Sequence, residues 1–443
     1  YWKTANDCSP SGTQNADYGT VYVQAGDSDA WQTQYAGPIS KVAVDSRQSL
    51  SGLEIHDFLT CYTRYDNTSA YGNALMLRGD YTDVIVNAHK SPDRYAEQKV
   101  TMPDGAAATM ICTIVDIEGE PREILFYIPD NASELHPDGA PVITVWAGGS
   151  QTNIIFFDST CWWETANQNG IALIFTNEAY NTSVAVPPAD VDACYHAMLD
   201  LLEGWNDSGK FQFDPSRIYS TGQSMGSVAT IALAENRASQ LAAVISSNAG
   251  GPSRLSGGDA IPAGLVVGEG NYADRGIPGY TADTSYPEDD TSVLVRSTEA
   301  AAAGADIYWD AAKNLKGATN HNMNDWIAYF TDANGLGEDS LSDVIVYSGG
   351  NALNGGHDDA QGSLSDWESN NARYRTWKWY NEDDIPVMTY IFSLYEAHNC
   401  IPGFRPLMWD FLEHYSVETA ADGTVTRYYS ASGFEQDDAV VIQ

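Results

Sequence analysis

The pentapeptide Gly222-Gln-Ser-Met-Gly226 surrounds a serine with the neighbours that a nucleophile needs on a tight strand-to-helix turn. A β-rich run at 217–221 precedes it and a helix-like run at 227–235 follows it. Small residues on both sides allow a sharp turn, so the serine Oγ projects from the edge of a sheet. The N-terminus of the following helix favours negative charge that develops beside that oxygen. The pattern predicts that Ser224 is a nucleophile, and the alternative is an ordinary turn with a surface serine.

The longer segment 214–226 resembles the nucleophile segment of secreted α/β-hydrolase esterases. It reads Asp-Pro-Ser-Arg-Ile-Tyr-Ser-Thr-Gly-Gln-Ser-Met-Gly and is similar to the polyhydroxybutyrate depolymerase and feruloyl esterase group. The resemblance extends over about residues 108–416, apart from much of an insertion. It implies a serine carboxylic-ester hydrolase that forms an acyl-enzyme, with its triad in the chain order serine, acid, histidine. No cofactor and no metal are expected.

His398 is the predicted general base. It follows the β-rich run 386–394 and precedes the helix-like run 404–415. The stretch 396–414 is similar to the histidine loop and closing helix of the family, and an imidazole suits proton transfer near neutral pH. The alternative is a loop histidine that only caps the next helix. The other histidines considered are His321 and His357 in the insertion, and His414, expected on the surface of the closing helix.

The acid of the triad is expected just after the β-rich run 263–267. The family usually has Asp three residues after a glycine there, but this sequence has Asn271, which carries no charge. Asp274 is the predicted acid if the turn is wider, and Glu269 is the alternative. An acid from the insertion is a further option, and each of these acids could instead be solvated.

Hydrolysis of an ester also needs N–H donors that face the developing oxyanion. The backbone N–H of Met225, directly after the nucleophile, is the first predicted donor. The second is expected from the loop 147–151, which reads Ala-Gly-Gly-Ser-Gln and has Ala147 where the family usually has His. Ser150 or Gln151 is the predicted donor there, and the alternative is a plain glycine-rich turn.

The remaining pattern predicts an α/β-hydrolase fold with a mostly parallel central sheet. Two β-rich runs, 108–116 and 122–129, flank a Gly/Pro turn and predict a hairpin. Helix-like runs then alternate with strand-like runs, and this alternation is typical of a parallel sheet covered by helices. The strands are predicted at 142–146, 171–175, 217–221, 241–246, 263–267 and 386–394, and the helices at 157–169 (closed by Gly170), after residue 188, at 227–235 and at 404–415.

Two parts of the chain depart from this alternation. Residues 1–105 are predicted to be a β-rich N-terminal extension or accessory domain, with a short strand at 84–87. Residues 106–443 form the predicted catalytic domain. Within it, about 275–380 is expected to be a large cap-like insertion before the last strand, with a helix-like run at 297–315.

The composition excludes several classes of partner. Of 443 residues, 22 are Lys or Arg and 60 are Asp or Glu, which gives a formal net charge of −38. Nucleic acids and anionic membranes would repel such a chain, and no apolar run approaches the ~20 residues that cross a bilayer. The acids are scattered, which favours a solubilising surface over a docking site for cations. The expected partner is an ester substrate, either small or polymeric, and the oligomeric state stays open.

The cysteines and the first residue suggest a compartment. Six cysteines occur without a CxxC pair, at Cys8, Cys61, Cys112, Cys161, Cys194 and Cys400. A zinc site is therefore not expected, whereas disulfides are. The sequence starts at Tyr1 without a signal-peptide pattern, and four glycosylation sequons occur, at Asn67, Asn131, Asn181 and Asn206. These features predict a mature secreted protein.

The substrate follows from the resemblance alone. It implies a polyester or oligoester of hydroxy acids, with an aromatic-acid ester such as a feruloylated sugar as the alternative. A serine peptidase, or a non-catalytic binding protein on a hydrolase scaffold, also stays open. The tryptophans near the site or in the insertion suit either an aromatic platform or core packing. They are Trp162, Trp163, Trp309, Trp326, Trp367, Trp377 and Trp379.

Overall fold

The computed structural model of the chain divides into two compact units. It describes residues 11–15, 19–23, 41–44, 83–102, 104–117, 119–149, 151–176, 188–268, 321–342, 346–348, 360–361, 374–393, 396, 398–433 and 438–442. The first unit is Tyr1–Asp83 with Lys99–Ala107, and the second is Val84–Gln98 with Ala108–Gln443. The first contains an antiparallel sheet of β1 (Thr13–Asn15), β2 (Gly19–Val23) and β3 (Lys41–Val44).

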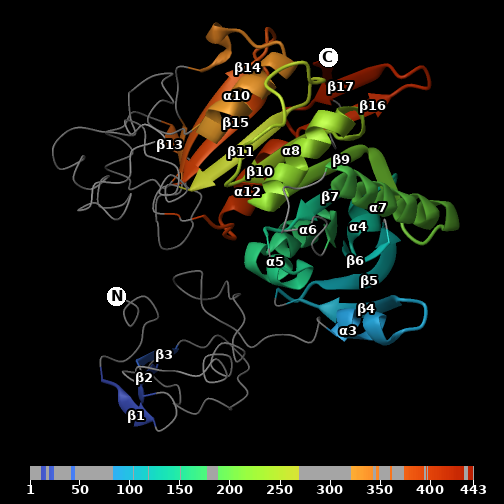
Figure 1. The fold of residues 1–443 in the computed structure, drawn as a ribbon, viewed down its shortest axis with the longest axis vertical. Helices are drawn as coiled ribbons and strands as arrows, with labels where there is room; N and C mark the ends of the chain where they lie inside the picture. Colours follow the sequence, from blue (N-terminus) through green and yellow to red (C-terminus); the bar gives the residue numbers. More distant parts are fainter. Residues whose placement is uncertain are drawn as a thin grey trace. The chain divides into compact units, whose positions relative to one another are not determined.

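The second unit is built on a large mixed sheet (Figure 1). Its strand order is β13-β12-β14-β15-β11-β10-β9-β7-β8-β6-β5-β4. The strands are β4 (Tyr95–Thr101), β5 (Ala107–Ile117), β6 (Glu120–Pro129), β7 (Ala140–Trp146), β8 (Ala172–Thr176), β9 (Phe213–Gln223), β10 (Ala243–Ser247), β11 (Ala263–Gly268), β12 (Val346–Ser348), β13 (Ala360–Gln361), β14 (Tyr374–Tyr380) and β15 (Pro386–Ser393). The central strands β8, β7, β9, β10, β11 and β15 pair in parallel with their neighbours in this order. β6 and β14 flank this group and pair with it antiparallel.

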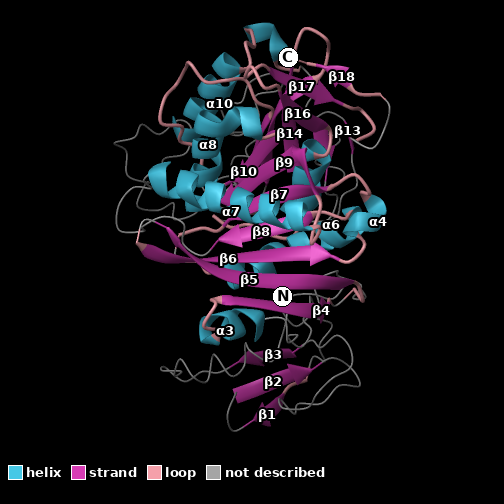
Figure 2. Cartoon of the chain, turned by 90° about the vertical axis from the view of Figure 1, so that its right-hand side faces the viewer, coloured by secondary structure: helices cyan, strands magenta, loops and turns pink. Residues whose placement is uncertain are grey.

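Helices cover both faces of this sheet (Figure 2). Every residue of β7 and β8 is buried, as expected for parallel strands packed on two sides. On one face, Trp146 and Ile174 belong to the same core cluster as residues of α7 (Pro188–Ser208), α8 (Met225–Arg237) and α10 (His321–Ala333). On the other face lie α5 (Asn153–Thr160), α6 (Trp162–Asn169) and α12 (Phe404–Leu412), and a short helix, α4, spans Ala132–Leu135.

The aromatic contacts show which side chains of the sheet face the second layer. Phe157 of α5 packs against Tyr127 and Phe175, with ring centroids 5.3 and 5.5 Å away. Because side chains alternate along a strand, Phe175 points away from its neighbour Ile174. The order of the strands, their parallel core and the two helical layers confirm the predicted α/β-hydrolase fold. The predicted hairpin is also confirmed, since β5 and β6 pair antiparallel from Ala108↔Pro129 to Ile117↔Glu120.

One predicted strand is wrong. Residues 84–87 lie in α3 (Asp83–Lys90), in which Val84 and Ala88 are buried. These two residues are four apart and therefore share one face of a helix. Asp83 in the first turn and Lys90 in the last turn also suit the helix dipole.

The predicted helix 157–169 is two helices. Cys161 lies between α5 and α6 with a φ of 51°, which ends the first helix with a left-handed residue. The predicted end at Gly170 is confirmed, with a φ of 65°. Thr152 caps the start of α5 through a hydrogen bond from the N–H of Ile155, so this helix begins earlier than the apolar pattern indicated.

The closing helix is shorter than predicted. α12 ends at Leu412, and Tyr415 already starts β16 (Tyr415–Thr419), which pairs with β17 (Val425–Tyr429). His414 therefore follows the helix instead of lying within it. A small sheet of β16, β17 and β18 (Val440–Val441) forms the described end of the chain.

Part of the predicted insertion belongs to the core. Met323 and Trp326 of α10 and Trp377 of β14 are each 1% exposed. β14 pairs with β15 and extends the central sheet. The predicted helix 297–315 lies outside the described residues. None of the helices in the described ranges is long and apolar enough to cross a membrane.

The described cysteines do not support the prediction of disulfides. Cys112, Cys161, Cys194 and Cys400 are all buried, and no disulfide joins one of these four to another. Burial raises the pKa of the Cys112 thiol to about 12, so this group stays protonated at neutral pH. Cys8 and Cys61 lie outside the described residues.

Candidate active site at the carboxyl edge of the sheet

Ser224 occupies the predicted turn between β9 and α8. Its φ of 57° and ψ of −115° place a non-glycine residue in a region that L-amino acids rarely adopt. The surroundings hold it there, because its N–H donates to the carbonyl of Ser247 over 3.0 Å. Its own carbonyl accepts from the N–H groups of Ser227, at 3.0 Å, and Val228, at 3.2 Å. The side chain is half-buried at the start of the helix.

Both glycines of the pentapeptide are required by close backbone approach. A Cβ at Gly226 would lie 1.9 Å from the carbonyl oxygen of Trp146. A Cβ at Gly222 would lie 2.2 Å from the carbonyl oxygen of Gly226 and 2.9 Å from that of Trp146. Any larger residue would push α8 away from β7 and β9. The small residues predicted from the motif therefore have a direct steric reason here.

The sheet brings four chain segments to one edge. In the register of the parallel strands, Gln223 pairs with Ser247, and Ser247 pairs with Val266. On the far side of β11, Gly268 pairs with Ser393 at the end of β15. Because parallel strands point the same way, the residues that follow β9, β10, β11 and β15 emerge at the same edge. These are the segments that carry Ser224, Asn248, the predicted acids and His398.

The predicted oxyanion loop lies against the residue after Ser224. A Cβ at Gly149 would be 3.3 Å from Cγ of Met225. Gln151 closes the loop on itself, since its Oε1 accepts from the N–H of Gly148 at 2.9 Å and its own N–H donates to the Gly148 carbonyl at 3.2 Å. Met225 is the first residue of α8, so its N–H is one of those that a helix leaves without an internal acceptor. Ser150 lies outside the described residues.

Gln223 is a residue of this site that the sequence did not single out. Its side chain is 4% exposed, and a Cβ at Gly148 would lie 2.4 Å from its Oε1. The side chain of Gln223 thus lies directly under the glycine-rich loop, and Gly148 leaves it room. The one sequence signal for this contact is that Gln223 occupies the variable position of the G-x-S-x-G pattern directly before Ser224.

His398 lies on the loop between β15 and α12, with an exposed side chain. The next residue anchors the loop, because the amide Nδ2 of Asn248 donates to the carbonyl of Asn399. The side chain of Asn399 also accepts from the N–H of Cys400 at 2.8 Å. On the other side of the loop, Arg405 of α12 pairs with Glu164 and donates to the Cys161 carbonyl. The histidine loop is therefore fixed at Asn399 and at its α12 end.

The predicted acids come directly after β11 in the sequence, which ends at the same edge of the sheet. β11 ends at Gly268, so Glu269 is the next residue and Asp274 follows shortly after. Asp274, Glu269 and Asn271 lie outside the described residues, and the identity of the acid stays a prediction. His357 also lies outside them, and His321 begins α10.

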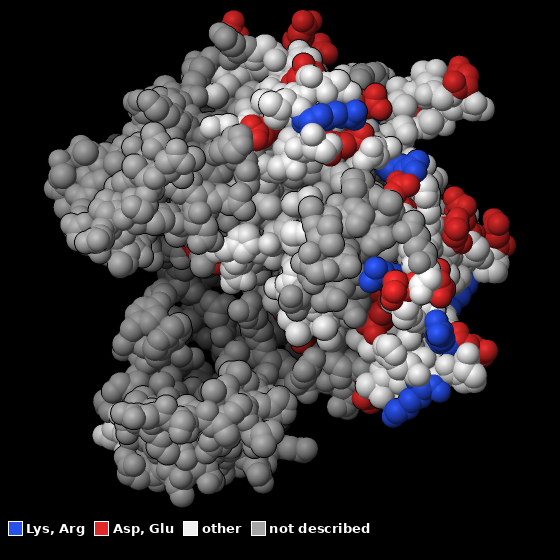
Figure 3. All heavy atoms as spheres, viewed as in Figure 1, with Lys and Arg blue, Asp and Glu red and all other residues white. Residues whose placement is uncertain are grey.

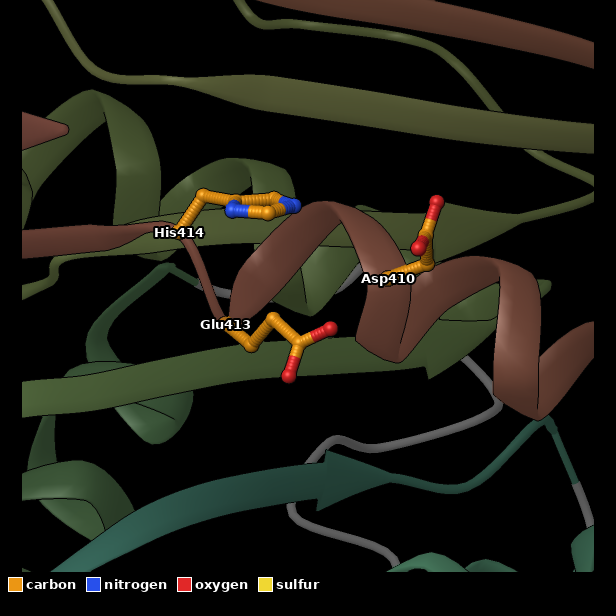
Figure 4. Close-up of side chains that lie close together, drawn as sticks. All are labelled: Asp410, Glu413 and His414. Atoms are coloured by element: carbon orange, nitrogen blue, oxygen red, sulfur yellow. The ribbon is translucent and has the colours of Figure 1, made fainter. Parts of the chain in front are cut away.

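One group of metal-ligand type occurs among the described residues, away from this edge. The ligand atoms of Asp410, Glu413 and His414 lie within 4.8 Å of one another (Figure 4). Nδ1 of His414 is 2.6 Å from the carbonyl of Ser430, and burial raises the pKa of Glu413. The hydroxyl of the neighbouring Tyr415 donates a hydrogen bond to the carbonyl of Pro386, the first residue of β15. This cluster therefore lies near the amino ends of the parallel strands, opposite the edge that carries Ser224.

The burial of the tryptophans and the distribution of surface charges bear on two alternatives for the described residues. The five described tryptophans of the set, Trp162, Trp163, Trp326, Trp377 and Trp379, are at most 4% exposed, so they pack in the core and form no exposed platform. Trp309 and Trp367 lie outside the described residues. On the face that Figure 3 shows, acidic side chains of the described residues are interspersed with Lys and Arg. That distribution agrees with a solubilising surface.

Comparison with known proteins finds similarity at the level of structures. No protein-family model matches the sequence, and no curated protein matches it. An acetyl xylan esterase from Aspergillus awamori is 14% identical, with a TM-score of 0.39 over 71% of this chain and 98% of that one. The feruloyl esterase module from Clostridium thermocellum is 13% identical, with a TM-score of 0.30 over 44% and 81%.

A thermostable esterase is 15% identical, with a TM-score of 0.29 over 40% of this chain and 55% of that one. The chain thus spans about half the length of that esterase. Similarity at these identities and TM-scores assigns no activity to the chain. The activity must be inferred from its own residues at the Ser224 edge.

Proposed function

We propose that the protein is a serine carboxylic-ester hydrolase that acts through an acyl-enzyme. The observation that carries this proposal is Ser224 itself, a non-glycine residue at a φ of 57° on a turn that two glycines make possible. Backbone strain of this kind is found where a side chain must be presented at a site, and it needs surroundings that enforce it. The hydrogen bond from Ser224 to Ser247 and the close packing of Gly226 on Trp146 supply that enforcement.

Each step of the reaction has a group at the same edge of the sheet. Ser224 Oγ attacks the ester carbonyl while His398 takes its proton, and His398 then gives that proton to the leaving alcohol. In the second half, water attacks the acyl-serine with His398 again as the base. The bond between the acyl carbon and Ser224 Oγ breaks, His398 returns the proton to Oγ, and the carboxylic acid is released. Asp274, with Glu269 as the alternative, would orient the imidazole.

The developing oxyanion is the second requirement. The N–H of Met225 at the start of α8 is one donor, and the loop 148–151 beside it supplies the other, through Ser150 or through the side-chain amide of Gln151. The contact between Gly149 and Met225 supports this pairing. Because the helix N-terminus also favours negative charge, all of these groups stabilise the same oxygen.

The proposed substrate is a polyester or oligoester of hydroxy acids, on the strength of the segments 214–226 and 396–414. Secretion is part of the same proposal and is supported by the four sequons and the acidic composition. Release of hydroxy-acid monomers or dimers from an amorphous polyester suspension would support the substrate. Turnover of methyl ferulate without release from the polyester would favour the aromatic-acid alternative, and cleavage of peptides alone would favour a peptidase.

Covalent labelling tests the activity itself. The intact protein is treated with a fluorophosphonate, the adduct is located by mass spectrometry, and a graded series of p-nitrophenyl esters is hydrolysed in parallel. We expect a single adduct on Ser224 and ester turnover, both lost in Ser224→Ala. A protein that is folded yet neither labelled nor active on esters would overturn the proposal in favour of a binding protein.

A further inference from the structure

We infer that Asn248 is a positioning residue that holds the His398 loop in register with the turn of Ser224 and with the start of the acid loop. This inference rests on the proposed function and extends it to a residue that touches no substrate. Asn248 directly follows β10, the strand between the nucleophile strand β9 and β11. It is 1% exposed.

The side chain of Asn248 joins two loops that are far apart in the sequence. Its Oδ1 accepts from the N–H of Gly268 at 2.7 Å, at the point where the predicted acid loop begins. Its Nδ2 donates to the carbonyl of Asn399, the residue after His398. One planar amide therefore fixes the distance between the segment that leads to the acid and the segment that carries the base.

The orientation of this amide follows from its partners. The group at Gly268 is a backbone N–H and can only donate, whereas the group at Asn399 is a carbonyl and can only accept. A side chain at this position must therefore present an acceptor on one side and a donor on the other. Among residues of this size, only asparagine does so without a change of protonation.

The backbone of Asn248 connects the same amide to the nucleophile. Its φ of 60° is left-handed, a conformation that asparagine tolerates better than most residues. Its N–H donates to the Val266 carbonyl at 2.8 Å, while the carbonyl of the preceding Ser247 accepts from the N–H of Ser224 at 3.0 Å. The dipeptide 247–248 thus forms hydrogen bonds with the nucleophile turn, with the end of β11 and with the histidine loop.

This geometry predicts an effect on catalysis through His398. The side chain of His398 is exposed, and its own loop is short of regular secondary structure, so its placement depends on such anchors. A displacement of about 1 Å at a reacting group can cost about 100-fold in rate. Loss of the Asn248 amide should therefore reduce kcat much more than it changes KM, because the binding surface for the substrate stays in place.

Asn248→Asp and Asn248→Gly separate the two hydrogen bonds. The aspartate keeps an acceptor for Gly268 but turns a second oxygen toward the Asn399 carbonyl, so it breaks only the bond to the histidine loop. The glycine keeps the left-handed backbone without strain and removes both bonds. Asn236→Asp is the matched control, because it removes the same kind of donor, to the Ala232 carbonyl at 2.7 Å, on α8 and away from the edge.

The measurements are kcat and KM on p-nitrophenyl acetate, the rate of fluorophosphonate labelling of Ser224, and thermal unfolding. We expect kcat to fall about 10- to 100-fold in both Asn248 variants, with KM within about twofold of the wild type and labelling slowed in parallel. The Asn236 variant should keep its kcat. The folded fraction at the assay temperature should be unchanged in all three.

Three outcomes would overturn the inference. Folded Asn248→Asp with wild-type kcat would show that the amide does not position the base, while an active, labelled wild type would leave the proposed function intact. A folded wild type without labelling or turnover would end both. Should neither Asn248 variant fold, amide exchange in the wild type decides, because rapid exchange of the Gly268 N–H would show that the proposed bond is not formed.

Discussion

At each end of the β10–β11 pair, one buried polar side chain hydrogen-bonds the backbone of neighbouring segments. The two side chains have different roles. At the carboxyl end, Asn248 joins Gly268 to Asn399. At the amino end, Arg427 of β17 donates to the carbonyls of Ala260 and Leu241, both at 2.8 Å, and to that of Ala238. Arg427 is 2% exposed and Asn248 is 1% exposed, so burial is the same and chemistry differs.

The difference lies in what each end has to hold. Arg427 donates to carbonyls of the segments that precede β10 and β11, and burial lowers the pKa of its guanidinium to about 10, so it stays charged at neutral pH. The carboxyl end contains the left-handed residues Ser224 and Asn248 and the crowded Gly226. The amino end thus stabilises the fold, whereas the carboxyl end contains strained residues that place side chains and lower the stability. This is usual where ligands bind at the carboxyl ends of parallel strands.

The largest expected effect concerns Ser224 at the carboxyl end. Ser224→Ala should lower kcat about 10⁴-fold or more, because the residual rate comes only from the oxyanion donors and substrate binding. The free energy of unfolding should change by less than about 1 kcal/mol, since the bonds that the structure shows at Ser224 come from its backbone. Stopped assays with p-nitrophenyl esters and urea unfolding measure the two quantities. A variant that retains a tenth of the activity would remove Ser224 as the nucleophile.

Gly226→Ala should affect both stability and rate. The new Cβ would lie 1.9 Å from the Trp146 carbonyl oxygen, so α8 has to move away from β7. Overpacking of this kind costs about 1–3 kcal/mol or more, and the shift also displaces the N–H of Met225. The free energy of unfolding in urea and kcat should therefore both fall. Gly204→Ala is the control, because a Cβ there meets nothing within 4 Å.

Arg427→Leu should lower stability without an effect on chemistry. It removes the guanidinium donor from the carbonyls of Ala238, Leu241 and Ala260, at a cost of about 1–3 kcal/mol in the free energy of unfolding for each carbonyl that is left unpaired. The kcat of the fraction that remains folded should equal that of the wild type. A selective loss of kcat in Arg427→Leu would show that the two ends of β10 and β11 are not separable.

Asp192→Asn should give the smallest effect, beside the amino end. Asp192 of α7 pairs with Arg237 through two bonds of 2.5 and 2.6 Å, and the hydrogen bond from Arg237 lowers the pKa of the carboxyl. A carboxyl with a depressed pKa stabilises the folded state above its ordinary pKa of about 3.9, and this contribution is lost as pH falls through the folded value. The pair is about one-third exposed, so we expect about 0.2–1 kcal/mol.

Urea unfolding of the wild type and of Asp192→Asn checks this dependence on pH. The difference in free energy between the two proteins should be present at about pH 6 and should shrink toward zero as the pH drops below 3.9. A difference that stays constant down to acid pH would show that the amide, and not the charge, is responsible. The kcat should not depend on this substitution at any pH.

The sequence predicted most of the strands because they are buried and bounded by turns. β7, β8, β10 and β11 each lie within a few residues of the predicted runs, and the strand-to-helix turn at Ser224 follows from its two glycines. The predictions failed where short segments were ambiguous. The run 84–87 contains three β-branched residues, but the buried residues of its helix, Val84 and Ala88, are four apart, and the predicted helix 157–169 is broken at Cys161, which no proline or glycine marks.

What the sequence alone determined is local: the order of the elements, the sharp turn that presents Ser224, and the positions of His398 and the predicted oxyanion loop at strand ends. What only the tertiary structure decided is which distant residues meet there. Gln223 lies under Gly148, and Asn248 bonds both Gly268 and Asn399, the latter 151 positions away in the chain. Such contacts depend on the lateral order and register of parallel strands. That order is set by how the buried faces of the strands pack with their helices, and not by any short segment of the chain.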